Sequence, residues 1–101
     1  MDKIIDLIVR NNVSLFGTNP SIEKINVGFT NSLYKINDSY IVKICTDIDN
    51  EGKFKKEISF YNSNKDNTLI PELYYSNTDK KDVPYFYEIL EKVMWCYETN
   101  A

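Results

Sequence analysis

The spacing of apolar residues predicts where helices and strands lie along the chain. Over residues 2–11 apolar side chains recur every three or four positions, as they do on one face of a helix. Over residues 22–29 they alternate with polar side chains, as in a strand with one buried face. The full pattern predicts a helix at 2–11, strands at 22–29, 33–36 and 40–45, a helix at 47–61, and strands at 70–75 and 84–90.

Two of these predictions define the fold class. The short polar stretch Asn37-Asp38-Ser39 joins the strands at 33–36 and 40–45, which predicts a hairpin. The helix at 47–61 carries an apolar stripe that is expected to pack against a sheet, and capping candidates lie at its start. The stripe is Phe54, Ile58 and Tyr61, and the capping candidates are Asp47, Asp49 and Asn50. We therefore expect an α+β fold: a five-stranded, mainly antiparallel sheet with an N-terminal helix and one helix between strands 3 and 4.

Composition and charge narrow the classes of protein. The chain has 101 residues, of which 43% are hydrophobic and 14% aromatic, so we expect one small domain spanning 1–101. Its formal charge of -3 comes from intermixed acidic and basic residues, which predicts no nucleic-acid partner. The N-terminal apolar run is too short to span a bilayer. We expect a soluble, cytoplasmic protein with no membrane partner, in which Cys45 and Cys96 are unpaired thiols.

Lys43 and Glu57 are the candidate chemical pair. Lys43 lies inside an apolar strand, and Glu57 lies beside the apolar stripe of the following helix. A charge at such a position is costly unless it is paired, and a helix that crosses the sheet places the two side chains together. The alternatives are a lysine that extends to water and a solvated helix glutamate. The neighbouring lysines Lys53, Lys55 and Lys56 are expected to lie mostly away from the packed side.

The stretch Gly28-Phe29-Thr30-Asn31-Ser32 is the candidate phosphate-binding loop. A glycine and small polar side chains allow backbone N–H groups to approach phosphate oxygens. The stretch does not have the Walker A pattern, and an ordinary hairpin turn uses the same residue types. The composition of the loop alone therefore does not identify a phosphate site, and its position before the strand that carries Lys43 is what favours one.

Taken in order, these segments resemble the N-terminal lobe of the aminoglycoside phosphotransferase and choline kinase family. The matching segments are 28–34, 40–44, Glu57, 70–71 and 84–91, and together they cover nearly the whole chain. The resemblance implies that Lys43 holds nucleotide phosphates and that Glu57 orients Lys43. It also implies that Thr30, Asn31 and Ser32 form the loop above the phosphates. The backbone of about residues 88–93, with Glu88 and Leu90, would be the hinge that contacts adenine.

The family's C-terminal lobe supplies the catalytic groups, and this sequence does not contain them. It has no histidine for a His-x-Asp catalytic segment and no aspartate after Leu90 for a magnesium site. Near the expected lobe boundary it departs from the family pattern and reads Met94 to Ala101. We expect a truncated or frameshifted phosphotransferase, or a trimmed chain, that binds ATP weakly and does not turn over alone. Magnesium would bind only together with a C-terminal lobe.

A second class of function stays open. The chain could be a non-catalytic interaction or regulatory module that keeps only the fold of the lobe. Its aromatic segment, which includes Tyr85, Phe86, Tyr87, Trp95 and Tyr97, would lose its cover if a second lobe were missing. This predicts a homodimer or binding to a separate C-terminal lobe. The alternative is that Trp95 and Tyr97 fold back over the chain's own sheet.

Overall fold

The computed structural model describes residues 2–25 and 31–92, which form one five-stranded sheet with helices on both sides. In chain order the elements are α1 Asp2–Asn11, α2 Val13–Phe16, β1 Ile22–Ile25, β2 Asn31–Ile36, β3 Tyr40–Cys45, the 3-10 turn η1 Ile48–Asn50, α3 Glu51–Ser63, β4 Leu73–Asn77 and β5 Tyr87–Glu91. The predicted α+β class is confirmed, as are the N-terminal helix and the helix between strands 3 and 4.

The sheet places β3 at its centre. The strand order is β1-β2-β3-β5-β4, and every neighbouring pair is antiparallel. Lys43 of β3 is directly opposite Leu33 of β2 on one side and Glu88 of β5 on the other. Residues opposite each other in an antiparallel pair project from the same face. Lys43 and Glu88 are therefore neighbours on one face of the sheet.

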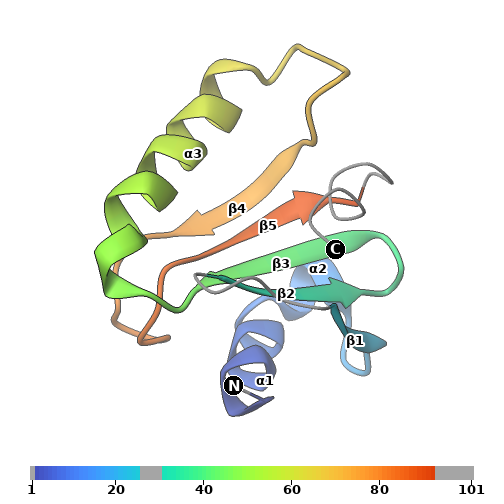
Figure 1. Cartoon of the computed structure of the whole chain (residues 1–101). Coiled ribbons are helices and arrows are strands. Elements are labelled where there is room, and N and C mark those ends of the chain that lie inside the picture. The colour runs from blue at the N-terminus through green and yellow to red at the C-terminus, as the bar shows by residue number, and fades with distance from the viewer. Residues whose placement is uncertain (1, 26–30, 93–101) are drawn as a thin grey trace.

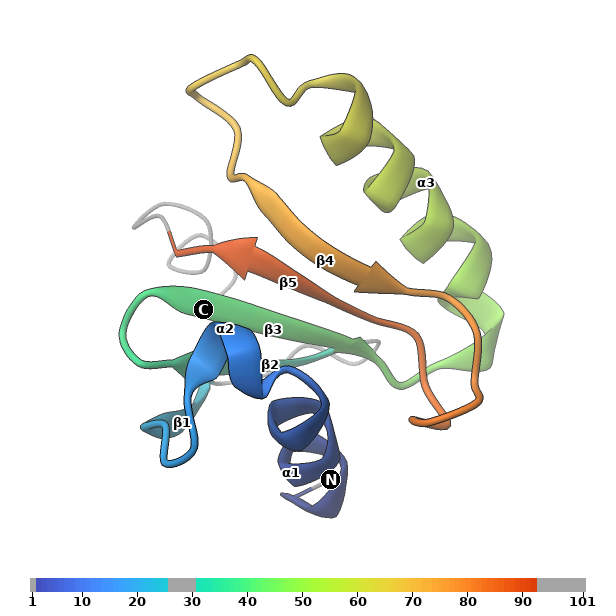
Figure 2. The ribbon, with the colours of Figure 1, turned by 180° about the vertical axis from the view of Figure 1, so that it is seen from behind.

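The helices cover opposite faces of the sheet, as the two views from front and back show (Figures 1 and 2). Beneath α1 and α2 lies the larger core cluster, with Ile5, Ile8, Val9, Phe16, Tyr34, Ile36, Val42, Ile44, Val83, Tyr87 and Ile89. On the α3 side, Phe54 and Ile58 pack with Cys45 and Phe86. Alternate residues of β3 therefore enter two different cores, and Lys43 belongs to the α3 side.

The turn between β2 and β3 confirms the predicted hairpin. Asn37 and Asp38 have φ values of 54° and 58°, in the left-handed region that Asn and Asp tolerate better than most residues. The Asn37 side chain also accepts a hydrogen bond from the Ser21 N–H at 2.9 Å and donates one to the Phe16 carbonyl at 2.9 Å. The turn is thereby attached to the segment that enters β1.

Several boundaries differ from the sequence predictions. β2 begins two residues earlier than expected, at Asn31, and the short helix α2 was not predicted. β4 and β5 both begin three residues later than expected, after Pro71 and Pro84, which have no N–H to donate to a ladder. α3 begins at Glu51, because the preceding residues form η1, where the Asp47 side chain accepts a hydrogen bond from the Asp49 N–H at 3.0 Å. Residues 26–29 of the predicted first strand lie outside the described residues.

The aromatic segment expected to be uncovered is packed where the structure describes it. Phe86 and Tyr87 are buried, and Tyr85 is half-buried against the α1 core. This part of the segment therefore does not support the predicted homodimer, and Trp95 and Tyr97 lie outside the described residues. Cys45 is a buried free thiol, and Cys96 also lies outside. Among the described helices, none has the length and apolar character needed to cross a bilayer.

We expect Ile44→Ala to destabilise the fold by about 2–5 kcal/mol, because it removes a fully buried side chain and leaves a cavity. The measurement is chemical denaturation. The matched control is Ile48→Ala, since Ile48 is 72% exposed and its truncation should change the unfolding free energy by less than about 0.5 kcal/mol. If Ile44→Ala does not fold, Ile44→Val should still cost about 1 kcal/mol. Equal effects at positions 44 and 48 would contradict the described core.

Candidate functional site

A bidentate ion pair joins the central strand to α3. The Lys43 ammonium lies 2.9 Å from each carboxylate oxygen of Glu57 and donates a hydrogen bond to both. The two side chains are 21% and 29% exposed, so the pair is at the edge of the interior and not sealed within it. This is the contact that the sequence predicted, and solvent or a ligand can still reach it.

The packing of α3 places Glu57 over β3. Phe54 and Ile58 anchor one side of the helix on the sheet, and Glu57 is the neighbour of Ile58 on that side. One helical turn further on, the Tyr61 hydroxyl donates a hydrogen bond to Glu57 Oε1 at 3.4 Å. Glu57 therefore has a hydrogen-bond partner on its own helix as well as on β3.

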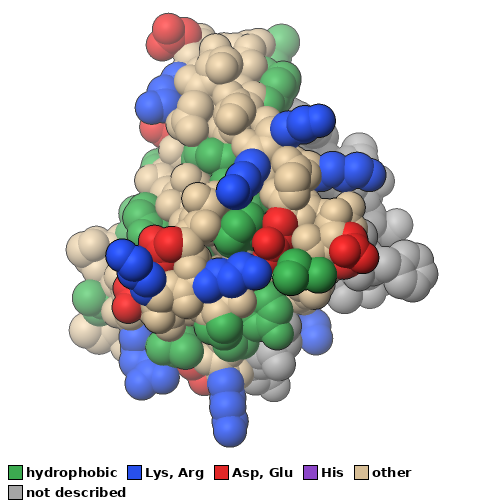
Figure 3. Space-filling view, turned by 90° about the vertical axis from the view of Figure 1, so that its left-hand side faces the viewer, with side chains coloured by type: hydrophobic (Ala, Val, Ile, Leu, Met, Phe, Trp, Pro, Cys, Tyr) green, Lys and Arg blue, Asp and Glu red, His purple; other side chains and the backbone are tan. Residues whose placement is uncertain are grey.

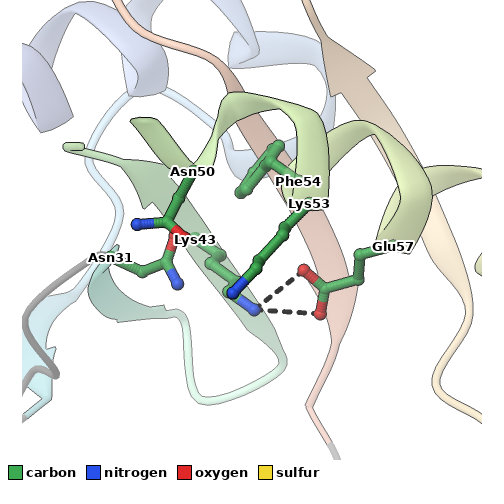
Figure 4. A pocket seen from close by; sticks show the side chains of 6 residues that line it. All are labelled: Asn31, Lys43, Asn50, Lys53, Phe54 and Glu57. Carbon is green, nitrogen blue, oxygen red and sulfur yellow. Dashed lines mark hydrogen bonds and ion pairs between the residues drawn. The ribbon is translucent and has the colours of Figure 1, made fainter. Parts of the chain in front are cut away.

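A pocket of about 310 Å³ opens beside the ion pair. Its lining residues are Asn31, Lys43, Asn50, Lys53, Phe54 and Glu57 (Figure 4). They come from the start of β2, the middle of β3, and the N-terminal part of α3 with the residue before it. Around the N-terminal end of α3, basic and acidic side chains are intermixed with apolar ones at the surface (Figure 3). The pocket thus combines ammonium and amide groups suited to a phosphate-bearing ligand.

A second carboxyl group lies beneath the ion pair. Glu88 is fully buried, and within the described residues neither of its carboxyl oxygens has a hydrogen-bond partner. The pKa of Glu88 is raised to about 9, mainly by burial and then by the negative charge of Glu57, while the Lys43 ammonium partly opposes the rise. Glu88 is therefore a neutral acid near pH 7, which leaves the Lys43 charge to be balanced by Glu57.

The predicted phosphate loop is only partly described. Thr30 lies outside the described residues. Asn31 lines the pocket, but it is the first residue of β2 and not part of a loop. Ser32 is buried and opposite Ile44, whose side chain is in the α1 core. The Ser32 side chain therefore projects from the face opposite Lys43, because successive residues of a strand point to opposite faces. The sequence analysis expected a loop here, to which this alternation does not apply.

Two residues of the predicted hinge, Glu88 and Leu90, are located inside the sheet. Both residues lie in β5, where Glu88 is opposite Lys43 and Ser76, and Leu90 is opposite Ile41 and Leu73. A strand paired on both sides uses its backbone N–H and C=O groups in the sheet, so they are not available to a nucleobase. The Leu90 side chain is also buried. Val93, the last residue of the predicted hinge, lies outside the described residues.

Lys53 is a pocket residue that the sequence reasoning did not single out. It is exposed, as expected of a lysine away from the packed side, and it lines the pocket with Lys43. A signal was present, because Lys53 precedes Glu57 by four residues and such residues share a helix face. Lys55 is also exposed, as expected, and its ammonium lies 5.4 Å from the centre of the Phe86 ring.

Solved structures of aminoglycoside phosphotransferases resemble this chain in fold. APH(2'')-Ib bound to ADP is 17% identical, with a TM-score of 0.65 over 91% of this chain and 28% of that one. APH(2'')-IIa in a ternary complex with streptomycin and ATP is 15% identical, with a TM-score of 0.67 over 93% of this chain and 29% of that one. Aminoglycoside 2'-phosphotransferase-IIIa in its GDP complex is 16% identical, with a TM-score of 0.72 over 91% and 30%.

These likenesses establish the fold, which is the predicted kinase-like N-terminal lobe. The chain spans less than a third of the length of each of these proteins. No protein-family model and no curated protein matches the sequence.

We expect the stability of the wild-type protein to fall as pH rises from about 5 to 8. The unfolded chain releases the Glu88 proton near pH 4.5, whereas the folded chain keeps it up to a pKa of about 9. The stability linked to this proton is thus complete below the unfolded pKa and is lost progressively up to the folded pKa, by at most about 1.4 kcal/mol per pH unit.

Glu88→Gln removes this titration, and denaturation at several pH values should show a flatter profile and higher stability near pH 8. Glu72→Gln, at an exposed glutamate, is the control and should keep the wild-type slope. Identical slopes for wild type and Glu88→Gln would contradict a neutral Glu88.

Proposed function

We propose that this chain is the nucleotide-binding N-terminal lobe of a small-molecule phosphotransferase of the aminoglycoside phosphotransferase family. The observation that carries the proposal is the bidentate contact between Lys43 and Glu57 at the edge of an open pocket. In a phosphoryl-transfer lobe of this type, a strand lysine binds nucleotide phosphates and a helix glutamate holds the lysine in place. The fold and the nucleotide complexes of the similar structures support the same assignment.

The roles of the pocket residues follow from their chemistry. The Lys43 ammonium has three N–H donors, and a phosphate oxygen can accept a hydrogen bond from one of them while Glu57 retains the others. The Asn31 amide lies at the same pocket and supplies a neutral donor. ATP is the ligand that we propose, although the phosphate contacts alone do not distinguish adenine from guanine. The base would require groups beyond the pocket described above.

Magnesium and catalysis require groups that the described residues do not provide. They contain no cluster of three or more His, Cys, Asp or Glu side chains that could hold a metal ion. Both oxygens of Glu57 are already bound to Lys43. A residue that orients an accepting hydroxyl is also needed for phosphoryl transfer, and the sequence contains no histidine for the family's catalytic segment. We therefore propose that these residues bind nucleotide without catalysing transfer alone, and that a C-terminal lobe supplies the missing groups.

Lys43→Met should weaken ATP binding at least tenfold while preserving the fold, because it removes the phosphate-binding charge from a side chain that is still partly exposed. The measurement is a titration of ATP followed by NMR, which detects millimolar affinities, with thermal unfolding recorded on the same samples. Lys65→Met is the control, since Lys65 is an exposed lysine that does not line the pocket. No ATP binding by the wild-type protein would refute the proposal. Destabilisation by Lys43→Met as large as that of a core truncation would indicate a structural lysine.

The isolated chain should show no phosphotransferase activity. Purified protein incubated with ATP, magnesium and an aminoglycoside or amino alcohol should produce no more ADP in a coupled assay than Lys43→Met does. ADP formation above that level that also depends on the acceptor would contradict the assignment of a non-catalytic lobe.

A further inference from the structure

The pocket beside the ion pair contains a second ammonium group, that of Lys53. Lys53 lies in the first turn of α3 and precedes Glu57 by four residues, so both side chains are on the same helix face. Figure 4 shows the Lys53 side chain extending from α3 toward the end of the Lys43 side chain, with Glu57 beyond it. Lys53 and Lys43 also line one pocket. Two lysines from different elements therefore face the same space.

The charge balance of the pocket depends on Lys53. The Lys43 ammonium and the Glu57 carboxylate are paired, so together they contribute no net charge. Glu88, beneath them, is held neutral by burial. Within the described part of the chain Lys53 forms no ion pair or hydrogen bond, whereas Lys35, Lys43, Lys80 and Lys92 each have a carboxylate partner. The net positive charge of the pocket is therefore that of Lys53.

The surroundings of Lys53 suit an anion that carries several oxygens. Asn31 and Asn50 bring amide groups to the pocket. Asn50 immediately precedes α3, yet its side chain does not cap the helix; its Nδ2 donates instead to Asp47 Oδ2 at 2.8 Å. The 3-10 turn η1 runs directly into α3, and the Glu51 N–H donates to the Ile48 carbonyl, so the ligand-binding groups of the pocket are its side chains. An ammonium and amides point to one ligand chemistry, a phosphate chain.

We propose that Lys53 is a second phosphate-binding residue, which contacts the terminal phosphate of a nucleoside triphosphate while Lys43 binds a phosphate nearer the nucleoside. This inference rests on the proposed function and adds a preference to it. We expect a triphosphate to offer a separate phosphate to each ammonium group, whereas a monophosphate has one phosphate for both. The pocket should therefore distinguish nucleotides by the number of their phosphates, and Lys53 should be the residue that makes the distinction.

The test compares Lys53→Gln with Lys56→Gln. Both variants remove one positive charge from an exposed position in the same helix, but Lys56 does not line the pocket. Inorganic triphosphate, ATP, ADP and AMP are titrated into each protein at low ionic strength and followed by NMR of backbone amides and of lysine side-chain CH₂ groups next to the ammonium. Lys53→Gln should weaken binding of triphosphate and of ATP about five- to tenfold and leave AMP unchanged. Lys56→Gln should change every affinity less than twofold.

The outcomes separate this inference from the proposed function. If Lys43→Met weakens ATP binding and Lys53→Gln does not, the role of Lys53 is refuted and the nucleotide-binding function stands. Equal weakening by Lys53→Gln and Lys56→Gln would also refute it, because that result is a general effect of charge. If the wild-type protein binds inorganic triphosphate through Lys53 but binds no nucleotide more tightly, the phosphate site is supported and the nucleotide-binding function fails.

Discussion

The contact between Lys43 and Glu57 defines the candidate site, because it joins the central strand to the helix that covers one face of the sheet at the edge of the pocket. Lys43 lies in β3, which pairs with β2 and β5. All of the remaining residues from Ile41 to Cys45 are buried and are apolar or small. A partly exposed ion pair contributes about 1 kcal/mol or less to stability. An apolar residue would therefore serve the fold at least as well. The lysine is better explained by a ligand that needs a fixed positive charge at this position.

The charge around that pair depends on the buried acid Glu88 and on the free ammonium of Lys53. Glu88 could add a negative charge, and Lys53 adds a positive one. Ionised Glu88 would offer Lys43 a second carboxylate and would make the cluster negative. Burial prevents this by keeping Glu88 protonated at neutral pH. Lys53 then gives the pocket a net positive charge. The pocket is thus suited to an anion, although the strand lysine itself is already paired.

Local sequence patterns were sufficient for the hairpin, the two long helices and the Lys43–Glu57 pair. Each of these depends on spacing over a few residues, such as the polar Asn37-Asp38-Ser39 turn between two apolar runs. The hinge at Glu88 and Leu90 could not be judged in this way, because it depends on β5 lying between β3 and β4, a pairing of segments that are distant in sequence. The side of the sheet on which Ser32 lies was missed for a related reason. β2 begins two residues earlier than expected, so Ser32 belongs to a strand and not to a loop. The burial of Glu88 follows from the same long-range pairing.

The account depends most on phosphate reaching Lys43, and a crystal structure of this protein with a non-hydrolysable ATP analogue tests that most directly. We predict a phosphate oxygen within about 3 Å of Lys43 Nζ, with Glu57 still bound to the same ammonium group. A nucleotide bound elsewhere, with the Lys43–Glu57 pocket empty, would contradict the central claim.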